Sequence, residues 1–236
     1  PLELGKTPAT SANLQGLEQK GTPTFTGSTV EVNGEQKEVT IKENSYTLVK
    51  DGAEVTTSPA YKKGTTDIIG TYTIDPATGE VTLTPTDKTY TGEVEPAVVQ
   101  ATGSNNVKVQ TTYTPTITPV TPTAEKSETS DVQGKVQTSP IKLDTEETGD
   151  DKGKTVNFDK GTQTGPKGER VELDPETLTL LNEAGEEVTS VTTPQGKYEL
   201  DKANKTISFT PNKDFVGTAT PVKVQIKDAN GTKVET

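Results

Sequence analysis

Apolar side chains alternate with polar ones, mostly threonine, along many short segments of the chain. Between Gly70 and Pro85 the apolar positions, Tyr72 and Leu83 among them, keep a period of two on both sides of the turn Asp75–Gly79. A period of two places one set of side chains on one face of a strand, and two such runs around a turn predict a β-hairpin. No segment has a sustained helical period, so the pattern predicts an all-β fold.

The same hairpin pattern occurs a second time. Gly196–Pro211 reads GKYELDKANKTISFTP, where Gly70–Pro85 reads GTYTIDPATGEVTLTP. In each copy another alternating segment follows and then a turn that favours positive φ, Gly103–Asn106 in the first and Asp228–Gly231 in the second. The chain therefore holds two tandem repeats of about seven short strands each, which predicts two Ig-like modules of the β-sandwich type.

Upstream of the hairpins the two copies match with loops of different length. Gln15–Gly16 corresponds to Gln133–Gly134, and three pairs of apolar positions follow in the same order: Val30 and Val32 with Val156 and Phe158, Val39 and Ile41 with Val171 and Leu173, Tyr46 and Leu48 with Leu178 and Leu180. These matches predict insertions in the second copy near Thr145–Lys152 and Thr162–Gly168, because loops tolerate added residues.

Composition along the chain predicts the boundaries of the repeats. Residues 1–16 are polar and are expected to be loose, residues 17–123 form the first repeat, and residues 124–236 form the second. The last strand of the second repeat is expected to be truncated. Spaced prolines in residues 114–123 favour an extended Thr/Pro-rich linker between two modules in an elongated arrangement. The alternative is that Thr114–Val120 forms a last edge strand of the first repeat.

The amino-acid composition limits the chemistry that the chain can perform. It contains no Cys, His, Met or Trp, with 6 Tyr and 4 Phe. Without thiols and imidazoles there is no cysteine nucleophile, no histidine base and no usual zinc or haem site. Paired acids for glycoside hydrolysis are the enzyme chemistry that remains, but few aromatic rings are present to stack on sugars. We therefore expect no enzyme, no catalytic residue, no cofactor and no bound metal.

Charge and hydropathy set further expectations. The net charge of −11 and the single arginine, Arg170, argue against nucleic acid and against anionic membrane surfaces. No apolar run approaches the ~20 residues that span a bilayer. The low apolar content, 27%, also leaves open that one or both repeats are partly disordered. We expect a monomer whose partners are neighbouring repeats of the same chain.

Two polar segments are candidate cation sites. Asp228 and Asn230 have the spacing of a partial calcium loop, but the glutamate that completes such a loop is absent, so a plain turn is the preferred interpretation. The run Thr145–Asp151 collects four carboxylates. Such a run is more often a solvated loop whose charges repel one another, which is the interpretation preferred here.

Together these segments resemble the CshA-type fibril repeat of streptococcal cell-wall-anchored surface adhesins. The resemblance rests on the YTIDPATGEVTLTP hairpin, on Tyr90-Thr91-Gly92 and Phe215-Val216-Gly217, on the Asp-Ala-Asn-Gly turn and on the closing YTPTITPVTPT segment. It covers nearly the whole chain, twice. It implies extracellular repeats that build a long stalk, anchored to the cell wall through other regions of the protein, with host-matrix adhesion carried largely by a separate region.

The function expected from this resemblance is that of a structural spacer that holds an adhesive tip away from the cell wall. The alternative is that the repeats themselves bind a host matrix protein or one another in cell–cell contact. Exposed aromatic residues would favour binding, and Tyr61 is the main candidate. No single residue carries a spacer function, so the informative positions are those of the predicted core: Tyr72, Leu83, Tyr198 and Phe209.

The resemblance also makes an internal Lys–Asn isopeptide bond worth considering. Lys108 and Lys233 occupy matching positions, and Asn105 and Asn230 lie in the turns before them. Both lysines fall on the outward phase of their strands, whereas the bond needs a lysine inside an apolar core, where an unpaired charge is costly. We therefore do not expect the bond.

Overall fold

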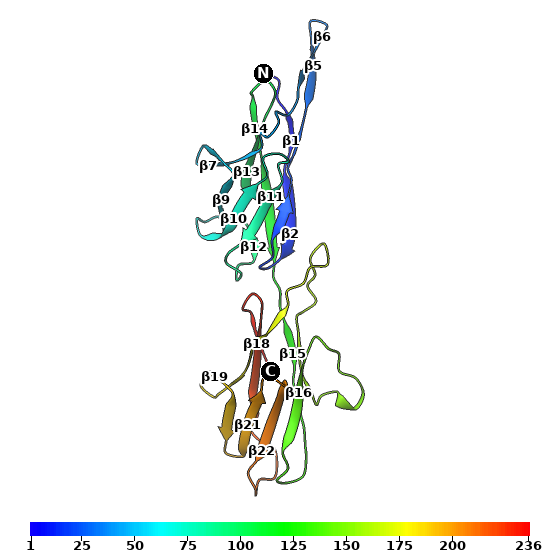
Figure 1. The fold of residues 1–236 in the computed structure, drawn as a ribbon, viewed down its shortest axis with the longest axis vertical. Coiled ribbons are helices and arrows are strands. Elements are labelled where there is room, and N and C mark those ends of the chain that lie inside the picture. The colour runs from blue at the N-terminus through cyan, green and yellow to red at the C-terminus, as the bar shows by residue number, and fades with distance from the viewer. The chain divides into compact units, whose positions relative to one another are not determined.

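The computed structural model describes all residues from Pro1 to Thr236, and almost every regular element in it is a β-strand (Figure 1). The chain divides into two compact units. Unit 1 comprises Pro1–Pro119 with Thr164–Glu169, and unit 2 comprises Val120–Gln163 with Arg170–Thr236. The only helix is the three-residue 3₁₀ turn η1, Gly149–Asp151. The chain has no helix with the length and apolar character of a membrane-spanning segment.

Unit 1 contains a four-stranded and a six-stranded sheet. The first has the order β3 (Gln19–Gly21), β11 (Val81–Pro85), β10 (Ile68–Ile74), β9 (Thr57–Tyr61). The second has the order β12 (Gly92–Glu93), β14 (Lys108–Thr118), β13 (Ala97–Thr102), β7 (Thr47–Lys50), β8 (Ala53–Val55), and β2 (Ala9–Leu14) pairs with β14 in parallel. Two short pairs complete the unit: β1 (Gly5–Thr7) with β4 (Thr24–Thr26), and β5 (Ser28–Val32) with β6 (Glu35–Val39).

The core of unit 1 lies between these two sheets. Tyr72 of β10 and Tyr113 of β14 meet edge to face, with ring centroids 6.1 Å apart. Tyr72 also donates a hydrogen bond from Oη to the carbonyl oxygen of Glu95 at 2.6 Å, which satisfies its buried hydroxyl. Burial raises the pKa of both tyrosines, that of Tyr113 to about 12. Leu83 and Val99 are fully buried in the same cluster.

Unit 2 repeats this layout with a six-stranded and a four-stranded sheet. The first has the order β15 (Thr123–Glu125), β17 (Val156–Asp159), β16 (Gln137–Leu143), β22 (Thr206–Pro211), β21 (Gly196–Asp201), β20 (Ser190–Thr193). The second has the order β19 (Glu187–Val188), β18 (Leu173–Leu181), β23 (Lys223–Asp228), β24 (Lys233–Glu235). Phe158, Leu180 and Ile226 are buried in the core of this unit.

The predicted hairpins are confirmed residue by residue. Tyr72 lies opposite Leu83 in the β10–β11 pair, and Tyr198 lies opposite Phe209 in the β21–β22 pair. The all-β fold of two sandwich-type repeats is likewise confirmed, since in each unit the alternating apolar side chains of one sheet face those of another.

The prediction that residues 1–16 are loose is wrong. They form β1 and β2, and Leu4 and Leu14 are buried in unit 1. The parallel pairing of β2 with β14 satisfies a whole row of backbone groups, from Ala9 opposite Tyr113 to Leu14 opposite Thr118. Polar side chains therefore do not prevent order here, because backbone pairing and two leucines hold the segment.

The Thr/Pro-rich segment is a strand of unit 1 over most of its length, and the linker prediction is wrong for Thr114–Thr118. These residues continue β14, which lies between β13 and β12 on one side and β2 on the other. Pro115 is tolerated although it lacks an N–H, and its carbonyl oxygen still accepts from Val94 N at 3.2 Å. Only residues 119–122 separate β14 from β15.

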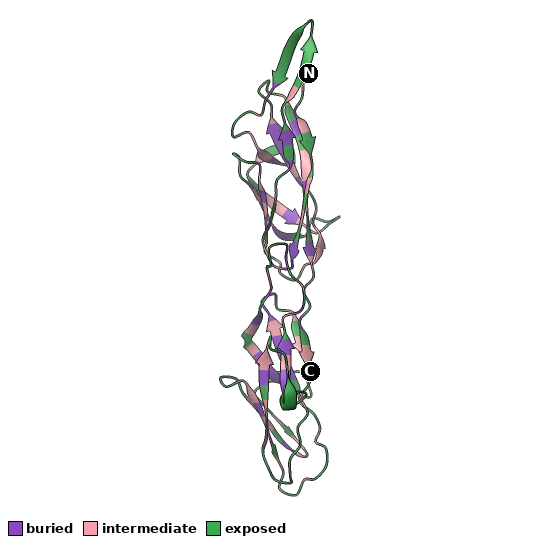
Figure 2. Cartoon of the chain, turned by 90° about the vertical axis from the view of Figure 1, so that its right-hand side faces the viewer, coloured by how far each residue is buried: buried purple, intermediate pink, exposed green.

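The match of Val30 and Val32 with Val156 and Phe158 is also wrong. Val30 and Val32 are exposed on the β5–β6 hairpin, which Figure 2 shows as almost wholly exposed. The counterpart of Phe158 is Phe25, since β4 pairs with β1 as β17 pairs with β15.

With this corrected match, one of the two predicted insertions stays and the other is wrong. The extra residues of the second copy fall between the start of β16 and β17, where Thr145–Lys152 lies. Residues 162–168 follow β17 at the place in the chain where the β5–β6 hairpin follows β4, so they replace that hairpin and do not lengthen the copy.

Candidate functional site

The turn at Asp228 is held by its own side chain. Asp228 Oδ1 accepts hydrogen bonds from Asn230 N at 2.9 Å and from Thr232 N at 3.0 Å. This is the geometry of an Asx turn, in which the carboxylate mimics a backbone acceptor. No group of three or more His, Cys, Asp or Glu side chains that could hold a metal is present in the chain.

The acidic run lies in the loop between β16 and β17, around η1. Glu147 Oε2 accepts from Gly153 N at 3.0 Å, which folds the loop back on itself, whereas Asp150 and Asp151 are exposed. The first three residues of the run, Thr145–Glu147, border a cavity of about 460 Å³ together with Asp144 and Asp159. These carboxylates form no group of three that could hold a metal ion.

The two matched lysines lie on exposed strand positions. Lys108 Nζ lies 2.6 Å from Glu54 Oε1, with 56% of the Lys108 side chain accessible. This hydrogen bond lowers the pKa of the Glu54 carboxyl. Lys233 is exposed in β24, and Asn105 Nδ2 donates to the carbonyl oxygen of Leu2 at 2.7 Å. Neither lysine lies in an apolar core, where isopeptide chemistry would require it.

Exposed aliphatic side chains provide a different candidate site. The six largest exposures of this kind are Val30, Val32, Ile68, Val132, Val136 and Val216. Tyr61, the aromatic residue expected on the surface, is half-buried in β9 and lies under Lys50 Nζ at 4.9 Å from the ring centroid. Val132 and Val216 are the most exposed of the six, at 66% and 70%, and both line the same hollow in unit 2.

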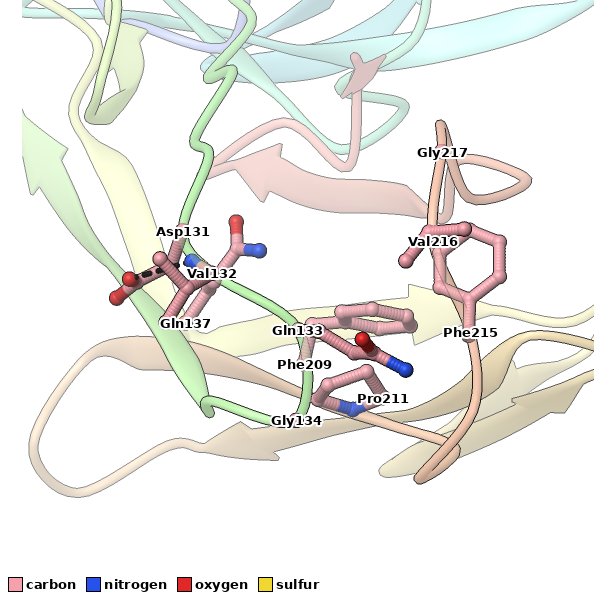
Figure 3. Close-up of a pocket in the computed structure, with 10 residues that line it drawn as sticks. All are labelled: Asp131, Val132, Gln133, Gly134, Gln137, Phe209, Pro211, Phe215, Val216 and Gly217. Atoms are coloured by element: carbon pink, nitrogen blue, oxygen red, sulfur yellow. Dashed lines mark hydrogen bonds between the residues drawn. The ribbon is translucent and has the colours of Figure 1, made fainter.

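This hollow, the unit 2 groove, has a volume of about 140 Å³. Figure 3 shows its two walls: Asp131–Gly134, which precedes β16, and Phe215–Gly217, which follows β22. Phe209 and Pro211 of β22 line it between the walls, with Gln137 of β16. The groove thus combines aromatic and aliphatic side chains with the polar end of a glutamine, as binding sites for small apolar groups do.

The wall before β16 has the same internal contacts as its counterpart in unit 1. Asn13 Oδ1 accepts from Leu14 N at 2.7 Å, and Asp131 Oδ1 accepts from Val132 N at 2.7 Å. A backbone turn follows in both copies, with Leu17 N bonded to the Leu14 carbonyl at 3.1 Å and the matching bond from Lys135 to Val132 at 3.2 Å. Val132 therefore occupies in unit 2 the place that Leu14 occupies in unit 1.

Two glutamines fix the wall to its surroundings in both units. Gln15 Nε2 donates to the Lys88 carbonyl at 2.8 Å, and Gln133 Nε2 donates to the Lys213 carbonyl at 3.3 Å. Gln19 Oε1 accepts from Ser11 at 2.6 Å, and Gln137 Oε1 accepts from Thr129 Oγ1 at 2.6 Å. The glutamine hydrogen bonds beside this wall are therefore the same in both units.

In unit 1, β14 lies beside the corresponding segment and its two glutamines. Ile117 is buried there, opposite Gly92 on one side and Asn13 on the other. Gln19 Nε2 donates to the Thr116 carbonyl at 3.1 Å, and Leu14 is only 1% exposed. In unit 2 the corresponding strand is β24, which ends at Glu235 after three residues.

The repeat pattern of the sequence contains a signal for this site, although it did not lead to a prediction of the groove. It matched Gln15–Gly16 with Gln133–Gly134, and the same offset places Val132 on Leu14. An apolar residue in the same position of both repeats indicates a shared core contact. In unit 1 this residue, Leu14, is buried, whereas in unit 2 it is Val132 and lines the groove.

Comparison with protein families gives one match that covers both repeats. The family described as the surface adhesin CshA repetitive domain matches residues 1–117 and residues 119–236. No curated protein matches the chain.

Proposed function

The chain belongs to the CshA repetitive-domain family of surface adhesins, and we propose that its two repeats act as structural spacers in the stalk of a cell-surface fibril. As repeats of a surface adhesin, they are extracellular segments at the cell surface. In the proposal, regions outside residues 1–236 anchor the protein to the cell wall and carry the adhesive tip. The repeats contribute length and have no enzymatic activity.

The observation that carries this proposal is that each repeat has a core of its own. The buried side chains form one cluster in unit 1 and a separate cluster in unit 2. Blocks with separate cores can be added one after another, and the reach of the array then grows with their number. The net charge of −11 supports the same role, because charged surfaces repel and keep neighbouring stalks from associating.

Small-angle X-ray scattering of the chain at physiological salt tests the spacer function. Two modules held apart should give a radius of gyration of about 30 Å, whereas one compact globule of this length would give about 18 Å. A two-bead distance distribution near the larger value supports the spacer. A value near the smaller one would contradict it, because modules packed into one body add little reach.

A second candidate function is binding by the repeats themselves, to a host matrix protein or to repeats on another cell. The β5–β6 hairpin favours it, since Val30 and Val32 expose 42% and 46% of their surface on a two-stranded element. The double change Val30→Ser and Val32→Ser should abolish capture of matrix proteins by the immobilised chain, and Thr29→Ala on the same strand serves as the control. Equal capture by all three proteins would exclude the hairpin as the binding surface.

A further inference from the structure

We propose that Asn33 is a deamidation site, and that its conversion to isoaspartate opens the β5–β6 hairpin. The reaction is a covalent change within the chain, with water as the only other reactant. The inference does not depend on the spacer function. It bears on the second candidate function, because the hairpin that changes is the one that exposes Val30 and Val32.

The chemistry requires an asparagine followed by a residue whose backbone nitrogen is accessible. That nitrogen attacks the side-chain carbon Cγ of the asparagine and closes a succinimide ring. The side-chain nitrogen leaves as ammonia and takes the amide proton with it. Water then opens the ring at one of its two carbonyls and gives aspartate or isoaspartate. Glycine after asparagine favours the attack, since no side chain shields its nitrogen. The chain contains two such pairs, Asn33–Gly34 and Asn230–Gly231.

The first pair, Asn33–Gly34, is the exposed turn between β5 and β6. Val32 pairs with Glu35 across it, and Asn33 and Gly34 have positive φ angles of 53° and 79°. Positive φ at both residues of a two-residue turn is typical of the type I′ turn. Both residues are exposed, an added Cβ at Gly34 would meet no atom within 4 Å, and Gly34 N donates no backbone hydrogen bond. The attacking nitrogen and the amide are therefore free to meet.

The second pair, Asn230–Gly231, has the same sequence, but its reacting groups are held in place. Asn230 is only 8% exposed, and its backbone N donates to Asp228 Oδ1 at 2.9 Å. Gly231 N donates to the Asp228 carbonyl oxygen at 2.9 Å, so the attacking nitrogen is already engaged. Reaction here has to wait until the turn opens. An opening that costs about 1.4 kcal/mol already slows the reaction about tenfold.

The two products change the hairpin in different ways. Aspartate adds one negative charge and keeps the normal backbone, and Asp-Gly fits a type I′ turn as Asn-Gly does. Isoaspartate leads the backbone through its Cβ and Cγ, which lengthens the turn by one methylene group. The longer turn no longer matches the register that places Val32 opposite Glu35.

Little else holds the hairpin once its turn is changed. β5 and β6 pair only with each other, and Val39 is the one buried residue in the two strands. Figure 2 shows the hairpin as an almost wholly exposed element. A two-stranded hairpin by itself is marginally stable in water. Isoaspartate at position 33 should therefore separate the strands, and Val30 and Val32 would no longer share an ordered surface.

The test incubates the whole folded chain at mildly alkaline pH and follows it by peptide mapping with mass spectrometry. The peptide that contains Asn33 should gain one mass unit, in two chromatographic forms, at least about tenfold faster than the peptide that contains Asn230. In urea, where both turns are unfolded, the two peptides should react at nearly the same rate. Incubation continues until half of the Asn33 peptide has reacted in urea, so that every sample is compared at the same time.

Two variants separate the reaction from its consequence. Asn33→Gly removes the amide and keeps a turn that Gly-Gly also forms, so its peptide should gain no mass and its hairpin should keep its amide NMR signals. Freshly prepared Asn33→Asp carries the added charge on a normal backbone and should also keep the signals of residues 28–39. The isoaspartate form of the unchanged chain should lose the shift dispersion of a hairpin at these residues.

Three results would overturn the proposal. The first is an Asn33 peptide that stays unreacted in the folded chain, which would mean that the turn protects it. The second is equal rates at Asn33 and Asn230 in the folded chain, which would mean that the structure does not select the site. The third is an isoaspartate form that keeps the hairpin signals, which would contradict the opening. None of these results depends on the radius of gyration or on capture of a matrix protein.

Discussion

Two tyrosines at the same position of the two repeats have different surroundings. Tyr72 donates from Oη to the Glu95 carbonyl at 2.6 Å, and Tyr198 donates in the same way to the Thr220 carbonyl at 2.8 Å. Tyr72 is 2% exposed, because Tyr113 of β14 covers its ring. Tyr198 is only half-buried, and its ring packs against Phe209 with centroids 4.7 Å apart.

The difference shows that a neighbouring ring decides how deeply this tyrosine is buried. Both units keep the same hairpin, the same tyrosine hydrogen bond and the same glutamine contacts beside the closing strand. In unit 1, β14 contributes the buried side chains of Tyr113 and Ile117 and lies beside the buried Leu14. Because a large apolar side chain contributes about 1.5–3 kcal/mol when buried, the fully buried Tyr72 should stabilise its unit more than the half-buried Tyr198 stabilises its own.

The largest expected effect comes from removing the buried ring. Tyr72→Ala should destabilise unit 1 by about 3–5 kcal/mol, because it removes a filled core position and leaves a cavity. Tyr198→Ala should cost unit 2 only about 1–2 kcal/mol, because that ring is already half in solvent. Urea unfolding followed by amide NMR signals of each unit measures both values. Equal losses would mean that β14 does not distinguish the two cores.

A second change introduces a unit 2 residue into unit 1. Gly21→Ser places a Cβ 2.4 Å from the Tyr113 ring, so the ring or β3 must move, at a cost of about 1–3 kcal/mol to unit 1. The reverse change, Ser139→Gly, is the control and should leave the unfolding of unit 1 unaltered. An unchanged midpoint for the Gly21→Ser protein would show that the Tyr113 ring does not depend on the glycine.

Alkaline pH should lower the stability of unit 1 in the unchanged chain. Burial raises the pKa of Tyr113 to about 12, whereas an unfolded tyrosine titrates near 10. The stability of unit 1 is therefore complete below pH 10 and falls as the pH rises, because the unfolded state releases its proton first. At pH 11 the loss from Tyr113 alone should be about 1.4 kcal/mol.

Tyr113→Phe is the matched variant for this pH effect, and urea unfolding at pH 8 and pH 11 gives the measurement. The phenylalanine variant loses the hydroxyl contact with Ser11, so each protein is compared with itself at the two pH values. It should lose less stability between them than the unchanged chain. If both proteins lose the same amount, the buried hydroxyl is not the cause.

The smallest effect is expected at the surface pair Lys108–Glu54. Both side chains are largely exposed, so Lys108→Ala should leave the unfolding midpoint of unit 1 within experimental error. The intact mass of the unchanged chain should equal the mass of its sequence, since neither Lys108 nor Lys233 lies in a core. A mass lower by one ammonia molecule would reveal an isopeptide bond and contradict this placement.

Side-chain periodicity was enough to predict the hairpins, because Tyr72 and Leu83 or Tyr198 and Phe209 must share one buried face. It failed for β2, whose order depends on hydrogen bonds to β14, a strand about a hundred residues later in the chain. It also failed at Val30 and Val32, where alternation on an exposed hairpin looks the same as alternation over a core. The groove could not be predicted, because its two walls, Asp131–Gly134 and Phe215–Gly217, are far apart in the sequence and come together only in the folded unit.

The parallel neighbours β2 and β14 also have a mechanical consequence. β2 begins near the N-terminus of unit 1 and β14 ends it, so pulling the two ends of the unit apart would slide one strand along the other. All hydrogen bonds between them would then share the load and would have to break together. Single-molecule extension of the whole chain would measure the force at which this pair yields.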